Sequence, residues 1–144
     1  MLKKILSISG KPGLFRLISY GKNMVIVEEL ATGRRLPAHA RDRIVSLGDI
    51  SIYTTEQEVP LAEILQTIFQ KEDGAVLDMA NLKTDGQLDA FFKEVLPNYD
   101  EARVYKTDIK KIIKWYNLLV EKGITDFTAK EDEEEAGEET QKED

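Results

Sequence analysis

Five short apolar segments, separated by tight turns, fill most of the first 54 residues, and this crowding constrains the fold more than any other feature. The segments cover residues 5–9, 14–20, 24–30, 35–40 and 50–54. Residues 24–27 are continuously apolar, which is typical of a strand covered on both faces. Thr32–Gly33 marks a tight turn, because glycine tolerates the positive φ that such turns need. The pattern predicts a small antiparallel β-roll or an SH3-like barrel.

Two proline-containing stretches refine this expectation. Gly10-Lys11-Pro12-Gly13 is interpreted as a hairpin turn. It is too short for a phosphate-binding loop and lacks the Gly-Lys-Ser/Thr ending of such loops. Pro37 has no N–H to donate, so residues 36–40 are expected to form an edge strand or a loop. Residues 40–43 are interpreted as a short helical turn.

After residue 58 the apolar positions repeat with the 3.6-residue period of amphipathic helices. Pro60 suits the first turn of a helix, where its missing N–H costs nothing. The predicted apolar faces of three helices are formed by Leu61, Ile64, Leu65, Ile68 and Phe69, then by Leu88, Phe91, Phe92 and Val95, and finally by Ile109, Ile112, Ile113, Tyr116, Leu119 and Val120. We therefore expect an α+β protein, with about three helices packed on or beside the β-rich part.

The expected organisation has three parts. Residues 1–57 form the β-rich part, residues 58–128 the helical region, and residues 129–144 an acidic tail. The tail has nine acidic and two basic residues and few apolar ones. It cannot bury enough apolar surface to offset chain entropy, so the sequence predicts a disordered, solubilising segment.

Charge is distributed unevenly along the chain. Residues 1–50 have a net charge of +5, residues 51–128 of −5 and residues 129–144 of −7. The candidate binding residues are the cations of the β-rich part, namely Lys11, Arg16, Arg34, Arg35, Arg41 and Arg43. Such side chains could contact phosphate or acidic groups. The alternative is a solvated basic edge that docks on the acidic helical half or discourages pairing between sheets, and the sequence pI of 4.9 favours it.

The sequence offers little for catalysis or metal binding. His39 is the single histidine and there is no cysteine, so the usual metal ligands and nucleophile–base pairs are missing. Asp42 and Asp49 lie in turns, where carboxylates usually cap the backbone. The run 131–135 lacks the spaced ligands of a calcium loop. We therefore expect a protein that is not an enzyme and uses no cofactor or metal.

Three stretches resemble a known family. They are Met1 to Phe15, Val45 to Ile50, and Glu58 to Leu61. In these stretches the sequence resembles a family of small uncharacterised proteins from Bacteroidetes-type bacteria. That family has an N-terminal domain of unknown function, a helical part and a charged tail. The resemblance implies a bacterial cytoplasmic protein and indicates no activity, ligand or catalytic residue.

Two hypotheses for the function remain open. In the first, the chain is a non-enzymatic binding module that contacts a protein or ribonucleoprotein partner through the basic β-rich half. In the second, it is a structural or oligomeric protein that uses an exposed sheet edge or Trp115 and has no nucleic-acid role. No apolar run is long enough to span a membrane, so the cytoplasm is the expected location and no membrane partner is expected.

Overall fold

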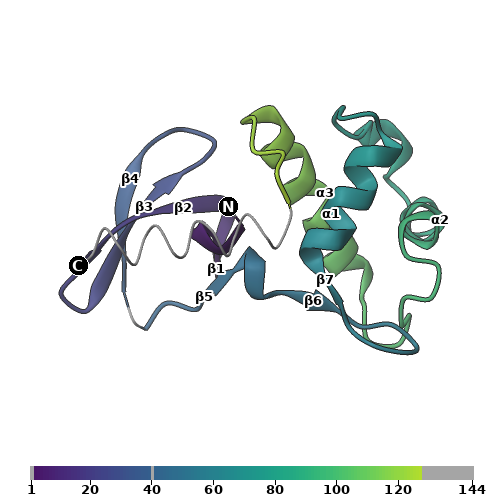
Figure 1. Ribbon diagram of the computed structural model, residues 1–144, viewed down its shortest axis with the longest axis horizontal. Coiled ribbons are helices and arrows are strands. Elements are labelled where there is room, and N and C mark those ends of the chain that lie inside the picture. The colour runs from purple at the N-terminus through teal and green to yellow at the C-terminus, as the bar shows by residue number, and fades with distance from the viewer. Residues whose placement is uncertain (1, 40, 128–144) are drawn as a thin grey trace. The chain divides into compact units, whose positions relative to one another are not determined.

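The computed structural model describes residues 2–39 and 41–127, and these residues form two units (Figure 1). The β-unit comprises residues up to Ile50 together with Asp126 and Phe127, and the helical unit spans Ser51–Thr125. The tail predicted for residues 129–144 lies outside the described residues. The domain boundary expected at residue 57 stays a prediction, and the structural division lies between Ile50 and Ser51.

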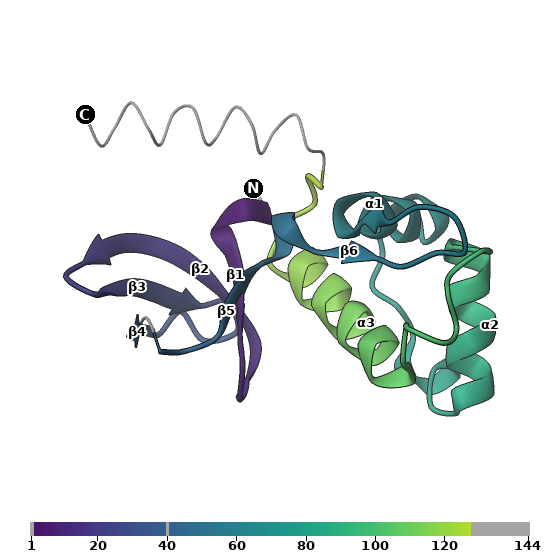
Figure 2. The same ribbon diagram turned by 90° about the horizontal axis from the view of Figure 1, so that it is seen from below.

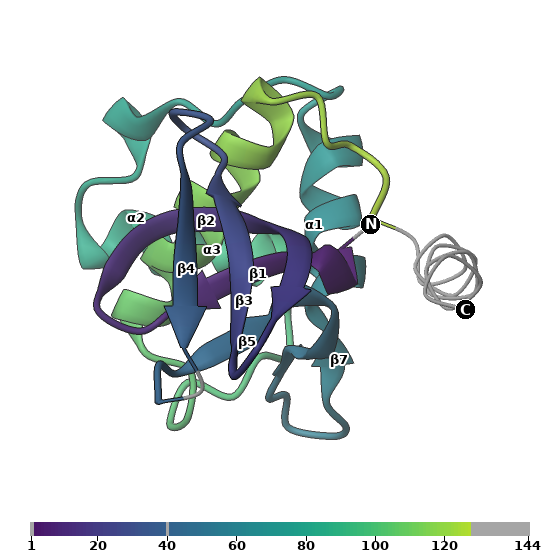
Figure 3. The same cartoon turned by 90° about the vertical axis from the view of Figure 1, so that its left-hand side faces the viewer.

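The β-unit is an antiparallel sheet framed by two short 3₁₀ turns (Figure 3). Its sheet order is β4-β3-β2-β1-β5, so β4 and β5 are the two edges and the described strands form no closed barrel. The antiparallel sheet of the predicted α+β fold is confirmed. The elements are η1 (Leu2–Lys4), β1 (Ile5–Ile8), β2 (Lys11–Gly21), β3 (Met24–Glu29), β4 (Arg35–His39), β5 (Ile44–Ser46) and η2 (Leu47–Asp49).

The pairing register shows that this sheet must curl. β4 ends at His39, which pairs with Met24 on β3, and Met24 pairs with Gly21 at the end of β2. β5 begins at Ile44, which pairs with Ile8 on β1, and Ile8 pairs with Lys11 at the start of β2. The chain from His39 to Ile44 can span at most about 18 Å, whereas β2 is roughly 33 Å long. The two ends can be joined only if the sheet rolls up, and register shifts in both β1–β2 and β2–β3 allow such bending.

One face of the rolled sheet holds the core of the β-unit. Phe15 and Leu17 share this face, as their spacing in the sequence predicts. Pro37 lies in edge strand β4, which also agrees with the sequence. The buried residues of this core are Leu6, Ile8, Phe15, Val27 and Ala38, with Leu17, Val25, Leu36 and Ile44 partly buried around them.

Three sequence interpretations need correction. The turn after β1 is only Ser9–Gly10, because Ile8 pairs directly with Lys11 and strand β2 continues through residues 11–13. The fifth strand of the sheet is Ile44–Ser46, which is too short for a periodic pattern. Residues 50–54 do not join the sheet; Ser51–Ile52 instead pairs with Val59–Pro60 in the helical unit.

The helical unit contains the three predicted helices (Figure 2). Each helix contacts the other two, and each buries most of the apolar face that its periodicity indicated. Phe69, Phe91 and Val120 are only partly buried. Thr84 caps α2 through a reciprocal pair of hydrogen bonds with Gln87. In the part of the chain that the structure describes, no helix combines the length and apolarity needed to cross a membrane. The elements are β6 (Ser51–Ile52), β7 (Val59–Pro60), α1 (Leu61–Lys71), η3 (Met79–Asn81), α2 (Asp85–Val95) and α3 (Lys106–Glu121).

Candidate binding surfaces

A row of charged side chains crosses the sheet on the face opposite its core. Arg16 on β2 is in register with Glu28 on β3, and Glu28 is in register with Arg35 on β4. Neighbouring strands lie about 4.8 Å apart, so both arginines flank the same carboxylate. The Arg35 Nε lies 3.4 Å from the Glu28 Oε2. The Arg16 Nε is buried and has no hydrogen-bond acceptor among the described residues.

The other predicted binding residues lie in or beside the connections. Lys11 is the exposed first residue of β2. Arg34 precedes β4, and Arg41 and Arg43 lie between β4 and β5; all three are exposed. Among the described residues these three arginines have no carboxylate partner. The structure therefore brings Arg16 and Arg35 together but leaves the remaining cations on separate connections.

His39 and Asp42, which the sequence analysis considered as metal-binding or catalytic candidates, have local structural roles. The backbone N–H of His39 donates to the Asp42 Oδ2 at 2.8 Å, which closes the turn after β4. The Ser9 N–H donates to the Arg43 carbonyl at 2.9 Å. These bonds anchor both ends of the connection that carries Arg41 and Arg43. Within the described residues no cluster of three or more His, Cys, Asp or Glu side chains could hold a metal ion.

The helical unit contains a pocket of about 370 Å³ that the sequence did not reveal. Leu77, Leu82 and Phe91 supply apolar lining. At the rim, the Lys71 Nζ on α1 lies 2.9 Å from the Glu94 Oε2 on α2. This contact raises the pKa of Lys71. The lining comes from α1, α2 and the segment between them, so no local motif predicts the pocket.

A buried tyrosine joins α2 to the segment that follows it. The Tyr99 hydroxyl donates a hydrogen bond to the Asp89 carboxylate, and its ring packs edge-on against Phe92 with centroids 5.0 Å apart. Burial, and then this bond, raise the pKa of Tyr99, while the bond lowers the pKa of Asp89. The Lys93 Nζ lies 3.3 Å from both the Asp89 Oδ2 and the Glu101 Oε1. We interpret this network as structural, because its hydroxyl, carboxylate and ammonium groups form hydrogen bonds and ion pairs with one another.

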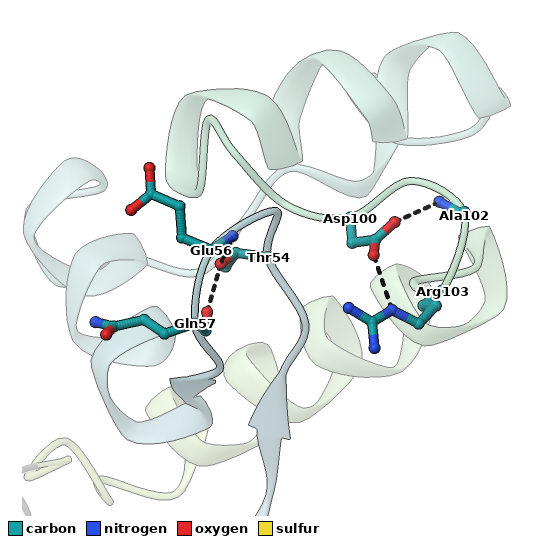
Figure 4. A network of polar contacts seen from close by, with 6 residues as sticks. All are labelled: Thr54, Glu56, Gln57, Asp100, Ala102 and Arg103. Carbon is teal, nitrogen blue, oxygen red and sulfur yellow. Dashed lines mark hydrogen bonds and ion pairs between the residues drawn. The ribbon is translucent and has the colours of Figure 1, made fainter.

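Two polar turns lie beside each other at one end of the helical unit (Figure 4). In the first, the Thr54 hydroxyl donates to the Gln57 carbonyl and accepts from the Glu56 N–H. In the second, Asp100 accepts from the Ala102 N–H at 3.0 Å and from the Arg103 Nε at 2.8 Å. The guanidinium carbon of Arg103 also lies 4.3 Å from the centroid of the Tyr53 ring. These contacts organise the entry to α3.

The fold and these surfaces define an α+β protein with a rolled antiparallel sheet and a three-helix unit. Domain of unknown function (DUF5606) matches residues 2–47, and Domain of unknown function (DUF6852) matches residues 50–119. The two matches meet close to the division between the units.

A structural genomics target from Bacteroides vulgatus, solved by solution NMR, is 55% identical to the chain, with a TM-score of 0.72. The alignment covers 88% of this chain and 91% of that one. No protein of curated function matches the chain. The chain belongs to the Bacteroidetes-type family defined by these two domains of unknown function, which confirms the resemblance seen in its sequence.

Proposed function

We propose that the chain is a non-enzymatic binding module that holds an anionic protein or ribonucleoprotein through its β-unit. The binding residues of this proposal are Lys11, Arg16, Arg34, Arg35, Arg41 and Arg43. One observation carries it: Arg34, Arg41 and Arg43 are exposed cations without a carboxylate partner among the described residues. They belong to a segment, residues 1–50, with a net charge of +5.

Arginine chemistry supports an anionic partner. A guanidinium group offers a planar set of N–H donors that matches the geometry of phosphate and carboxylate groups. Arg34 precedes edge strand β4 and Arg35 is its first residue, and no strand of the described sheet pairs with the outer side of β4. An extended partner could therefore use backbone and guanidinium donors together. We also propose that the rolled sheet binds its partner as an SH3-like barrel does and that the protein is cytoplasmic.

The test measures binding of two fluorescent probes, a single-stranded RNA oligonucleotide and a glutamate-rich peptide, to the full chain. In the variant, Arg34, Arg35, Arg41 and Arg43 are all replaced by Gln. We expect it to lose affinity for at least one probe while its thermal unfolding stays close to wild type, because exposed charges contribute only about 0–1 kcal/mol each. The matched control replaces the same four arginines by Lys, which keeps the charge but removes the planar fork.

The salt dependence separates the two kinds of partner. For RNA, each lost phosphate contact should reduce the slope of log K against log salt by about 0.7. Loss of affinity in the Gln variant with partial retention in the Lys variant would support the proposal. If wild type binds neither probe at about 50 mM salt, or the Gln variant binds both as wild type does, the arginines are only solvated surface.

A structural or oligomeric role is the second candidate, and the open sheet favours it. β4 and β5 are edges of the described sheet, and Val45 on β5 is 46% exposed. An exposed apolar residue on an edge strand favours pairing with a second sheet. If sedimentation shows a dimer that Val45→Lys dissociates, this role is supported. A monomer at all concentrations would remove it.

A further inference from the structure

The pocket of the helical unit has an apolar lining that two neighbouring segments build together. Leu77 and Leu82 come from the segment between α1 and α2, and both are buried. Phe91 comes from α2 and is only partly buried, so part of its ring remains available to a ligand. The lining residues of α2 follow an i, i+3, i+4, i+7 spacing, which places them on one face of that helix. They are Gln87, Ala90, Phe91 and Glu94.

Hydrogen bonds within the unit fix the walls of this pocket. Two bonds from the side-chain amide of Asn117 on α3 hold the backbone of Leu77. The Asp78 carboxylate accepts a backbone N–H at 3.0 Å and so caps the short turn η3. At the start of α2, the Gln87 side chain accepts the Thr84 N–H at 3.1 Å. A pocket with walls already held in place binds a ligand without a large ordering cost.

Carboxylates outnumber cations in the lining. Its ionisable side chains are one ammonium group and three carboxylates, namely Lys71, Glu72, Asp78 and Glu94, so its formal charge is −2. The Lys71 Nζ is already shared, at 2.9 Å from the Glu94 Oε2 and 3.8 Å from the Glu72 Oε2. Within the described part of the chain Asp78 has no cationic partner. The pocket therefore complements a cation that lies beside an apolar group.

Two exposed apolar side chains extend the apolar surface beyond the pocket. Val76 is 44% exposed and directly precedes Leu77, while Met79 is 42% exposed and directly follows Asp78. Their Cα atoms therefore lie about 3.8 Å from those of two lining residues. A small molecule inside the pocket leaves both side chains in water, whereas a segment of a partner protein can cover them. Methionine suits such a contact, because its flexible side chain adapts to a partner's shape.

We propose that this pocket binds a basic segment of a partner protein that also carries an apolar anchor. The anchor, a side chain such as Leu or Phe, packs against Leu77, Leu82 and Phe91. A Lys or Arg beside it pairs with the Asp78 carboxylate. Anchors of this kind supply much of the affinity of such contacts, and charge complementarity supplies specificity. The proposal is independent of the function proposed for the β-unit, because it involves other residues and a partner segment of the opposite charge.

Peptide binding to the full chain tests the proposal. The probe is a fluorescent peptide of Leu and Lys, with Leu along one helix face and a length of roughly four helical turns. We expect saturable binding by fluorescence anisotropy, with ¹⁵N amide shift changes that gather on residues 76–94. A peptide with Ser in place of Leu keeps the charge and should bind at least about tenfold more weakly. A peptide of Leu and Glu should not bind at this site.

Ala90→Arg is the variant that blocks the pocket. Ala90 lines the pocket and is exposed on α2, so an arginine there adds a cation and occupies space. Arginine is a strong helix former, so thermal unfolding should stay close to wild type. We expect the affinity for the Leu/Lys peptide to fall at least about tenfold. The matched control is Ala102→Arg, which makes the same change of charge at an exposed residue outside the lining and should bind as wild type does.

A second variant tests the charge without filling the pocket. Asp78→Asn removes the carboxylate, while the asparagine side chain can still cap the turn η3. We expect it to weaken binding of the Leu/Lys peptide and to reduce the dependence of that binding on salt, since one ion pair is lost. The thermal unfolding of this variant should stay close to wild type. This variant keeps the test decisive if Ala90→Arg disturbs α2.

Several outcomes would overturn the proposal. If the Leu/Lys peptide does not bind, or binds no more tightly than the Ser/Lys peptide, the pocket holds no apolar anchor. Equal affinities of Ala90→Arg and Ala102→Arg would show that the peptide responds only to the overall charge. Amide shifts at the lining with 4-phenylbutylamine, but none with the peptide, would make this a small-molecule site. A dimer of the full chain that Ala90→Arg dissociates in sedimentation would make the occupant a second copy of the chain.

Discussion

The side-chain amide of Asn117 on α3 forms two hydrogen bonds with the backbone of Leu77, forty residues earlier in the chain. The Asn117 Oδ1 accepts from the Leu77 N–H at 2.7 Å, and the Asn117 Nδ2 donates to the Leu77 carbonyl at 3.3 Å. The neighbouring Tyr116 hydroxyl donates to the Ala75 carbonyl at 2.7 Å. Together they fasten the segment after α1, which lines the pocket of the helical unit, to α3.

Replacing Asn117 by Ala should destabilise the protein by about 1–3 kcal/mol, because two backbone groups lose their partners in a partly buried setting. Urea unfolding would measure the change. The matched control is Asn81→Ala on the exposed turn η3, where the Asn81 Nδ2 donates to the Asp78 Oδ2 at 3.3 Å and bonds to no other group of the described residues. Equal costs at both positions would show that the Asn117 contact does not fasten the segment.

The Tyr99–Asp89 bond should make part of the stability depend on pH. It lowers the pKa of Asp89 below its ordinary value of 3.8 in the folded protein. The ionised carboxylate therefore stabilises the fold above that ordinary value, and this contribution disappears as the pH falls below it. We expect Tyr99→Phe to cost more stability near pH 6 than near pH 3.

The measurement is urea unfolding of wild type and Tyr99→Phe at both pH values. Tyr105→Phe is a suitable control, because Tyr105 is 64% exposed. It should show a small cost that does not change with pH. A Tyr99→Phe cost that is the same at both pH values would mean that the hydroxyl does not act through the Asp89 carboxylate.

Two adjacent residues on α3 should differ strongly in how much stability is lost when each is replaced by Asp. Ile113 is 1% exposed, whereas Lys114 is exposed. Ile113→Asp places an unpaired charge in the apolar interior and should cost more than about 3 kcal/mol. Lys114→Asp should change stability by less than about 1 kcal/mol. Thermal unfolding would measure both, and similar costs would contradict the assigned helix face.

Much of the fold follows from local patterns. The apolar spacing in residues 61–69 and 109–120 requires one buried helix face, since that face can be covered only by packing. Pro37 restricts its segment to a sheet edge because it cannot donate to a second neighbour. The pattern was too short to indicate Ile44–Ser46, and the glycines around Lys11 concealed the true start of β2.

The candidate sites depended much more on tertiary structure. The uneven charge along the sequence identified the arginines of the β-unit as candidate binding residues. The partner of Arg35 could not be predicted, because the position of Glu28 beside it depends on strand register. The pocket at Lys71 and Glu94 depends on how α1 meets α2.

The sequence by itself determined the element types, the apolar faces and the uneven charge, because these depend on residue spacing and composition alone. Tertiary structure decided which distant groups meet. The curl of the sheet follows from strand register, and the Asn117–Leu77 and Tyr99–Asp89 bonds follow from packing between segments. The lysines of α3 show both levels. The spacing of Lys106, Lys110, Lys111 and Lys114 is local, but their lack of carboxylate partners among the described residues appears only once the neighbouring elements are in place.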